Sequence, residues 1–336
     1  MIMQPAILAL LLGSILVSFM VVYAAGYGVS ILRNWDLKDG SEFQLNLERK
    51  TYLISTVMSY TFGFQLLSLF LFIFSADKLS GLFVGAMCAA GTLNMNGFGY
   101  PALIFKIINF ILGGVWLIVN YTDNRAFDYP LIKKKYAFLL VVAPFILCEM
   151  VLQGAFFLNL DPHIITSCCG SLFSPEGQGV GALFLSTLPT VPMKIVFYAA
   201  VILTGVSGFK FYSRGRPVTG YFFSLMSIIT FIVAVAALIS FISLYIYQLP
   251  THHCPFCILQ KEYYYVGYLL YVTLAVGVVG GASVGALLPA RNIPSLQDHL
   301  PGIAKRLTLV SIVFYLLFTI IVTATMIFTS FRLEGY

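Results

Sequence analysis

The sequence is poor in charged residues, and it has no long polar stretch. Of its 336 residues only 10% are charged, whereas soluble domains carry about 25%. So little charge cannot cover a water-exposed surface, which excludes a soluble domain, a disordered protein and a nucleic-acid-binding protein. The short polar loops also leave no room for a nucleotide-binding loop or a Ser-His-Asp set. Hydrophobic residues make up 60% of the chain, a composition typical of multi-pass membrane proteins.

Eight apolar runs are each long enough to cross a bilayer, which takes about 20 residues in a helix. They lie at roughly 5–32, 51–75, 101–120, 136–160, 185–209, 221–248, 258–289 and 307–330. The sequence therefore predicts an all-α fold of eight transmembrane helices. The first run is expected to be a retained helix rather than a signal peptide, because no basic residue precedes Arg33.

The positive charges predict the orientation of these helices. The net charge is +6, and most of the 19 Lys and Arg residues lie in four segments, each after an odd-numbered run: Arg33, Lys38, Arg49 and Lys50; Arg125, Lys133, Lys134 and Lys135; Lys210, Arg214 and Arg216; Arg291, Lys305 and Arg306. Basic loops stay on the cytoplasmic side, so both termini are expected outside. The outer segment 76–100 contains an apolar stretch too short to cross, and we expect it to be re-entrant.

The six cysteines are distributed unevenly over this predicted topology. Cys148 lies within the fourth run, where it is expected to be a small packing residue. The other five are predicted on the outer side: Cys88, Cys168, Cys169, Cys254 and Cys257. Their concentration on one face indicates a shared role in an oxidising compartment.

Two cysteine motifs suggest chemistry. Cys254-Pro255-Phe256-Cys257 is a C-x-x-C pair, which can form a redox-active disulfide, bind a metal or act as a structural disulfide; no His follows Cys257, so covalent haem is excluded. We expect the pair at the N-terminus of the seventh helix, where the helix dipole stabilises a thiolate. Cys168 and Cys169 are adjacent, and their Cα spacing of about 3.8 Å is below the usual disulfide range. They are expected to be a reactive pair, partners of other cysteines or soft-metal ligands.

The segment from Cys254 to Lys261 resembles the motif of the DsbB family, in which a C-x-x-C is followed by a basic residue at a quinone site. The order of cysteine pairs over about 136–289 is similar to that of the vitamin K epoxide reductase family. The resemblance implies that Cys254 and Cys257 form the disulfide near the quinone (ubiquinone or menaquinone) and that Lys261 lies beside it. It also implies that Cys168 and Cys169 exchange electrons with a thioredoxin-like periplasmic protein. The chain would then lie in a bacterial cytoplasmic (inner) membrane, with its cysteine loops on the periplasmic side.

Other residues in the chain have alternative interpretations. Tyr264, Tyr268 and Tyr271 have helical spacing, and they would line a quinone pocket or belong to an interfacial tyrosine belt. Lys106 and Glu149 are ionisable residues within predicted spans, where they would form an ion pair or carry protons.

The predicted organisation has three parts: helices 1–3 with the re-entrant segment in 1–135, a redox-like four-helix unit in 136–289, and the last helix with a short tail in 290–336. A weak parallel repeat between the two halves would make Cys88 a partner for Cys168 or Cys169.

The leading hypothesis is a membrane thiol–disulfide oxidoreductase that passes electrons between a periplasmic thiol protein and quinone. One alternative is a soft-metal transporter of the copper or mercury type, with ligands from His163, Cys168, Cys169, His252, His253, Cys254 and Cys257. Another is a non-catalytic anchor subunit of a larger membrane redox complex. Whether the chain is an enzyme is left open between them.

Overall fold

The structure is helical throughout the part that it describes. A computed structural model describes residues 4–36, 40–161, 189–329 and 331. Among these residues there is no β-strand, and eight helices are long and apolar enough to cross a membrane. The predicted all-α fold with eight membrane-spanning helices is therefore confirmed. The side of the membrane on which the termini lie stays a prediction.

The helices have the following bounds. The eight long ones are α1 (Pro5–Asn34), α2 (Glu42–Ser80), α4 (Gly99–Asp123), α5 (Ile132–Leu158), α8 (Thr190–Arg214), α9 (Pro217–Ala237), α11 (Val266–Leu287) and α12 (Leu300–Phe328). α9 continues through the π-helical turn η1 (Leu238–Ile242) into α10 (Ser243–Tyr247), and together they form one span. The short elements are α3 (Ala89–Leu93) and the 3-10 turns η2 (Cys257–Leu259), η3 (Lys261–Tyr263), η4 (Leu288–Ala290) and η5 (Pro294–Leu296).

Three helices begin well away from the start of their apolar runs, and one of them is α12, which begins at Leu300 rather than near 307. α2 begins at Glu42 rather than near 51, because the polar stretch before the apolar run is also helical. α11 begins at Val266 rather than near 258. Tyr264 and Tyr265 adopt the left-handed conformation, with φ of 53° and 56°, and they separate α11 from the two short turns before it. Apolarity measures burial or lipid exposure, and it does not distinguish a helix from a buried loop.

The segment 76–100 contains no further crossing helix among its residues. α2 continues into it as far as Ser80, and α3 is a helix of only five residues, all of them buried. A helix of this length cannot span a bilayer, in agreement with the sequence interpretation. Whether the segment lies on the outer side, as expected for a re-entrant element, stays a prediction.

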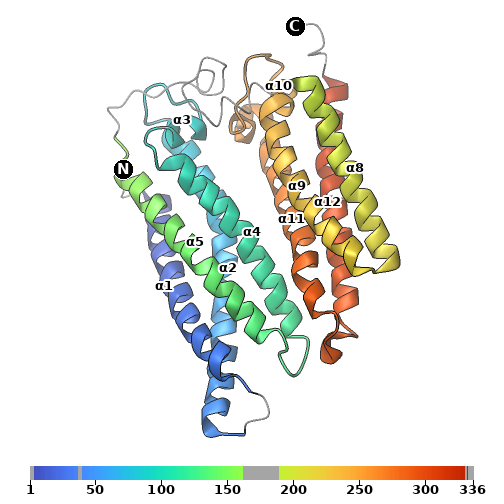
Figure 1. The fold of residues 1–336 in the computed structure, drawn as a ribbon. Coiled ribbons are helices and arrows are strands. Elements are labelled where there is room, and N and C mark those ends of the chain that lie inside the picture. Colours follow the sequence, from blue (N-terminus) through green and yellow to red (C-terminus); the bar gives the residue numbers. More distant parts are fainter. Residues whose placement is uncertain (1–3, 37–39, 162–188, 330, 332–336) are drawn as a thin grey trace. The chain divides into compact units, whose positions relative to one another are not determined.

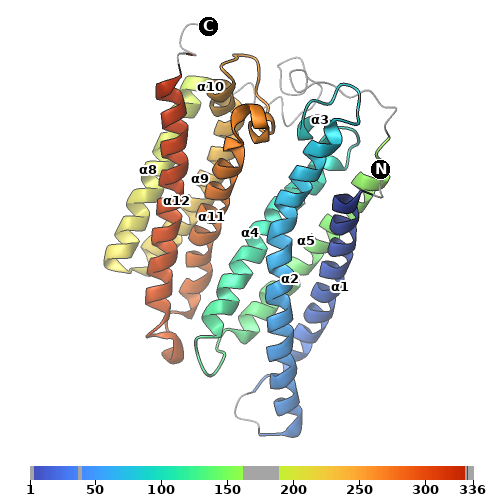
Figure 2. The same cartoon turned by 180° about the vertical axis from the view of Figure 1, so that it is seen from behind.

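The chain divides into two compact units, each built around four of the long helices. Unit 1 contains the described residues within Met1–Ser75, Met95–Asp161 and Pro289–Ile303, and unit 2 those within Ala76–Asn94, Pro162–Leu288 and Ala304–Tyr336. In unit 1, α5 packs against both α1 and α4; in unit 2, α9 packs against both α8 and α11 (Figures 1 and 2). The helix of the fourth apolar run thus belongs to unit 1, so a redox bundle formed by runs 4–7 stays a prediction.

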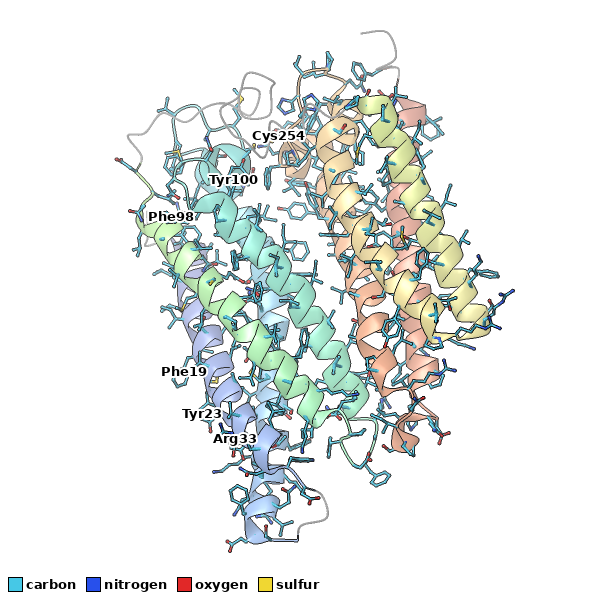
Figure 3. All side chains as sticks on the ribbon, in the orientation of Figure 1. Phe19, Tyr23, Arg33, Phe98, Tyr100 and Cys254 are labelled. Atoms are coloured by element: carbon cyan, nitrogen blue, oxygen red, sulfur yellow. The ribbon has the colours of Figure 1, made fainter. Side chains whose placement is uncertain are left out.

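Unit 1 has an aromatic core where its helices approach closely. Trp116 of α4 stacks on Phe62 of α2 with ring centroids 5.0 Å apart, and its Nε1–H donates to the Lys135 carbonyl at 3.2 Å. Gly113 makes this approach possible, since a Cβ there would lie 2.9 Å from the Phe62 ring. Phe19 and Tyr23 lie on the face of α1 that points away from the neighbouring helices (Figure 3). They are 66% and 56% exposed, as expected of a lipid-facing helix surface.

Unit 2 is held together by small and hydroxyl-bearing residues. Thr204 of α8 and Thr230 of α9 are joined by a hydrogen bond of 2.7 Å between their hydroxyls. The Tyr315 hydroxyl of α12 donates to the Ser227 carbonyl of α9 at 2.7 Å, and its ring lies against Gly277 of α11. Such contacts are typical of helices packed within membranes, where the hydrophobic effect does not drive association.

Candidate functional site

Three buried cysteines of unit 2 meet in a cluster that we call the thiol cluster: Cys88, Cys254 and Cys257. Cys88 directly precedes α3, Cys254 lies in the loop after α10 (Figure 3), and Cys257 begins η2. Their relative exposures are 0%, 0% and 5%. The Sγ atoms of Cys88 and Cys254 are 3.5 Å apart, and the three sulfurs all lie within 4.8 Å of one another. The fold thus unites a C-x-x-C pair with a cysteine 166 residues before Cys254.

Tyrosine hydroxyls hold the loop that carries the C-x-x-C pair. The Tyr247 hydroxyl, at the end of α10, donates to the Cys254 carbonyl at 2.6 Å. The Tyr271 hydroxyl of α11 donates to the Pro255 carbonyl. Both bonds are made to backbone atoms, so they fix the path of the loop independently of its side chains. The loop is therefore clamped from the helix before it and from the helix after it.

Close backbone packing fixes the end of this loop. Ile258 lies against Gly267 in the first turn of α11, where an added Cβ would be 2.7 Å from Ile258 Cγ1 and 2.9 Å from its carbonyl oxygen. Only glycine leaves room for the loop at this distance. The position of Cys257, one residue before Ile258, therefore depends on Gly267.

Gln260 links the loop to the segment that carries Cys88. Its Nε2 donates to the Met87 carbonyl at 2.8 Å and lies 3.5 Å from Asp77 Oδ1 near the end of α2. The Cys88 carbonyl in turn accepts the Gly91 N–H at 3.1 Å, which starts the first turn of α3. One amide side chain thus couples the two halves of the thiol cluster.

The π-helical turn before the loop positions His253 by a contact with a backbone carbonyl. In a π turn the hydrogen bonds skip one residue further than in an α-helix, which leaves carbonyls available to other donors. His253 Nδ1 lies 2.8 Å from the Ile239 carbonyl within η1. His252 packs its ring edge-on against Tyr247, with centroids 4.4 Å apart. Among the described residues, the group of possible metal ligands is the thiol cluster alone, and neither histidine belongs to it.

Two titratable side chains of the loop have clearly shifted pKa values, and burial is the main cause of both shifts. Burial lowers the pKa of the His252 imidazole; His253 lowers it further, and a thiolate at Cys88 acts in the opposite direction. Burial also raises the pKa of the Tyr263 phenol, and the Glu262 carboxylate and a thiolate at Cys257 act in the same direction. His252 is therefore neutral at pH 7, and Tyr263 keeps its proton.

The expected helix N-terminus at the C-x-x-C pair is wrong. Cys257 begins a three-residue 3-10 turn, and α11 starts nine residues later at Val266. The dipole of the seventh long helix therefore does not act on the Cys257 sulfur, since its effect falls off within one turn. Lys261 accordingly lies in the turn η3, outside α11, and its side chain is exposed.

The predicted single tyrosine face is also incomplete. Tyr268 and Tyr271 lie in the first turns of α11 and are partly buried, but Tyr264 precedes the helix in a left-handed conformation and is 93% exposed. The spacing of the three tyrosines suggested one face because helical geometry was assumed as far back as 258. Lys261 and Tyr264 are thus both exposed, and the role of Lys261, Tyr264, Tyr268 and Tyr271 in quinone binding stays a prediction.

Several predicted residues belong to unit 1 rather than to unit 2, or lie outside the described part. Cys168, Cys169 and His163 lie outside the described residues. Cys148 is exposed on α5 in unit 1, rather than packed inside the protein as expected. The predicted pairing of Lys106 with Glu149 is confirmed, with Nζ 2.7 Å from Oε1. The structure brings Cys88 beside Cys254. The expected pairing of Cys88 with Cys168 or Cys169 stays a prediction, because these two residues lie outside the described part.

Sequence reasoning missed the polar side chains that hold the loop. Tyr247 and Gln260 do not stand out in the sequence, because each lies in an apolar or motif-containing stretch and each donates to a backbone carbonyl. The sequence offered two weak hints: the aromatic residues that end the sixth run and a glutamine next to the C-x-x-C motif. Comparison of the chain with protein-family models, curated proteins and solved structures finds no match, so the assignment depends on the site itself.

Proposed function

We propose that this chain is a membrane thiol–disulfide oxidoreductase that works through the thiol cluster. The observation that supports this most is the convergence of three buried sulfurs within 4.8 Å, one of them from a distant part of the chain. Thiol–disulfide exchange needs an attacking sulfur beside a disulfide sulfur, and burial protects the pair from unrelated thiols. Packing alone gives no reason to gather three cysteines at one place.

The geometry suits exchange between Cys88 and a Cys254–Cys257 disulfide. The Cys88 thiolate, 3.5 Å from Cys254 Sγ, attacks that sulfur and forms a Cys88–Cys254 bond. The Cys254–Cys257 bond breaks, and its electron pair leaves on Cys257 as a thiolate. This internal step consumes no oxidant, because one disulfide and one thiolate are present before and after it. Cys88 can thus carry the disulfide from the C-x-x-C pair to a partner.

The partner in this proposal is a thioredoxin-like protein that presents a dithiol on the periplasmic face of a bacterial cytoplasmic membrane. Its two thiols are oxidised to a disulfide while a disulfide of this chain is reduced to two thiols. Cys168 and Cys169 are proposed to take part in the transfer. The resemblance implies membrane quinone as the two-electron acceptor that restores the disulfide. Lys261 and Tyr264, which the resemblance assigns to the quinone site, are both exposed, so the proposed transfer includes no step at that site.

A second candidate function is the binding and transport of a soft metal ion such as Cu(I). Three thiolates bound to one metal at about 2.3 Å place their sulfurs about 4 Å apart. The thiol cluster approaches this arrangement, with all sulfurs within 4.8 Å and one pair at 3.5 Å. The ligand set then contains Cys88 and lacks both His252 and His253. Reduced thiols and bound metal would characterise this function.

Thiol trapping in membranes separates the two functions. Free thiols are alkylated with a mass-adding maleimide in membranes incubated with and without an oxidised quinone analogue. The oxidoreductase predicts that Cys254 and Cys257 change between the reduced and oxidised states with quinone, and that Cys88→Ser stops transfer to a dithiol substrate. Cys148→Ser is the matched control, since this cysteine belongs to unit 1 and is not one of the three cysteines of the cluster. Permanently reduced cysteines with one bound copper per chain would instead establish the metal function.

A further inference from the structure

Unit 1 contains a cavity of about 100 Å³ at one end of its helices. The end of α1, the first turns of α2, the connection between α4 and α5 and the first turn of α5 surround it, and these segments lie at the lower end of the unit in Figure 1. A closed cavity of about 150 Å³ can hold benzene, so this one has room for a small chemical group. The lining residues that bear on its chemistry are Trp35, Glu48, Thr51, Tyr52, Tyr129 and Lys135.

The cavity lies where α2 passes from polar to apolar sequence. Glu48 belongs to the polar first turns of this helix, and Thr51 and Tyr52 begin its apolar run, roughly 51–75. Tryptophan and tyrosine are enriched at this boundary in membrane proteins, where lipid headgroups meet the hydrocarbon. A ligand in the cavity therefore lies at the level of the headgroups.

The lining contains one carboxylate that no described cation neutralises. Glu48 Oε1 accepts a hydrogen bond from Gln44 Nε2 at 2.9 Å, and no described Lys or Arg forms an ion pair with it. The Lys135 ammonium also lines the cavity, but it lies 2.8 Å from Asp123 Oδ2 and 3.0 Å from Asn120 Oδ1. Because the charge of Lys135 is balanced by Asp123, the cavity keeps a net negative charge from Glu48.

A buried hydroxyl of the lining lacks a hydrogen-bond partner. Thr51 is 3% exposed, and its Oγ1 makes no hydrogen bond with any described residue. Other threonines of α2 donate to the carbonyl four residues before them, as Thr56 and Thr61 do at 3.0 Å. A buried hydroxyl without a partner is unfavourable, so Thr51 is suited to bind a ligand in the cavity.

We propose that this cavity is a binding site for a primary alkylammonium group, such as the one in the headgroup of an ethanolamine phospholipid. Aromatic rings attract organic cations, and Trp35, Tyr52 and Tyr129 line the cavity. The Glu48 carboxylate supplies the opposite charge, and the Thr51 hydroxyl accepts an ammonium N–H. A quaternary ammonium has no N–H to donate to Thr51, so a primary ammonium fits these groups better.

The residues beside the cavity favour a lipid as the source of this ammonium. Lys50 and Lys133 are exposed, and each directly neighbours a lining residue in the sequence. A zwitterionic phospholipid carries a phosphate next to its ammonium, and lysine binds phosphate as a point charge. The acidic cavity and the basic residues next to it thus complement both charges of such a headgroup, whereas a soluble amine would use the cavity alone.

Tryptophan fluorescence of the full-length chain in non-ionic detergent micelles tests this site. Of the two tryptophans, Trp35 lines the cavity and Trp116 lies in the core of unit 1. Short-chain phosphatidylethanolamine, phosphatidylcholine and phosphatidylglycerol are titrated at constant ionic strength. We expect a saturable change of Trp35 emission with the ethanolamine lipid, at least tenfold tighter than with the other two, and no such change in Trp35→Phe. Ethylammonium chloride is the soluble probe: half-saturation at the same concentration as the lipid would assign the site to a soluble amine, and weaker binding assigns it to lipid.

Two substitutions of similar size test the groups assigned to the ammonium. Glu48→Gln removes the charge and should weaken binding of the ethanolamine lipid by tenfold or more, and Thr51→Val removes the hydroxyl and should weaken it about fivefold. The matched controls Glu42→Gln and Thr61→Val make the same changes on α2 outside the lining and should leave the affinity within twofold.

The comparison of lipids uses the wild-type chain, so it decides the proposal even where a variant fails to fold. Absence of a change with the ethanolamine lipid, equal binding of all three lipids, or tighter binding of the glycerol headgroup would each overturn the proposal. Unchanged affinity in both Glu48→Gln and Thr51→Val would also overturn it. None of these readouts depends on the thiol cluster.

Discussion

The buried pair Lys106–Glu149 provides the sharpest test of how unit 1 is held together. Removing one partner leaves the other charge uncompensated, which costs about 3–5 kcal/mol for buried pairs. The contacts predict an asymmetry within this range. After Lys106→Met, Glu149 keeps the two amide donors of Gln65 and Asn109. After Glu149→Gln, the Lys106 ammonium loses its carboxylate, and its contacts among the described residues are then the Ser68 hydroxyl, the Phe72 ring and a neutral amide at position 149, so this variant should lie nearer the upper limit.

A double-mutant cycle measures this coupling. The variant that combines Lys106→Met with Glu149→Gln removes both charges and is expected to be more stable than Glu149→Gln alone. The free energy of unfolding is measured in detergent micelles. As a control, Lys106→Met is combined with Asp123→Asn, whose partners are different and which lies about 25 Å along α4 at 1.5 Å per residue.

The double-mutant cycle compares the additivity of two pairs of substitutions. The control pair should be additive within about 0.5 kcal/mol, because distant sites without shared partners do not couple. If Lys106→Met and Glu149→Gln are also additive, or if either costs less than about 1 kcal/mol, the pair is not the buried, mutually dependent interaction described here.

Three further predictions concern the loop of the thiol cluster and the end of α4. Gly267→Ala places a Cβ against Ile258 and should cost about 1–3 kcal/mol, with faster alkylation of Cys257 in the folded protein; unchanged alkylation would show that the loop does not depend on this glycine. Tyr247→Phe removes the hydrogen bond to the Cys254 carbonyl and should cost about 1 kcal/mol by thermal unfolding, whereas Tyr264→Phe, at an exposed side chain, should have no effect. Asp123→Asn weakens two contacts: the ion pair with Lys135 and the hydrogen bond from the Leu131 N–H. Hydrogen exchange at Leu131 should therefore accelerate. An unchanged rate would contradict the role of Asp123 in holding the loop between α4 and α5.

Hydrophobic content was sufficient to predict the class and most of the fold. Each of the eight apolar runs contains a long helix, because a span must satisfy its backbone hydrogen bonds within itself. The bounds were less predictable. The predicted seventh helix included Ile258–Tyr265, which contains the polar residues Gln260, Lys261 and Glu262 and folds as two 3-10 turns followed by two left-handed residues. Because this segment directly precedes the apolar part of the run, composition did not show where the helix begins.

The site was predictable only in part. The C-x-x-C motif is local, so Cys254 and Cys257 could be chosen from their spacing. Cys88 could be recognised as an unusual cysteine, yet its approach to Cys254 depends on Gln260 and on the fold of α3, neither of which follows from spacing. The pairing of Lys106 with Glu149 was one of two interpretations open from the sequence, beside proton transfer, because opposite charges in apolar spans stabilise one another; the structure shows the pair.

The sequence by itself determined that this is a membrane protein of eight helices with a C-x-x-C motif, since apolar length and residue spacing are properties of the chain alone. Only the tertiary structure decided which distant residues meet. It brought Cys88 to the C-x-x-C pair, and it gathered Gln65 and Asn109 around Glu149. Contacts between separate helices depend on their rotation and packing, and these are fixed by many small contacts that no single segment encodes.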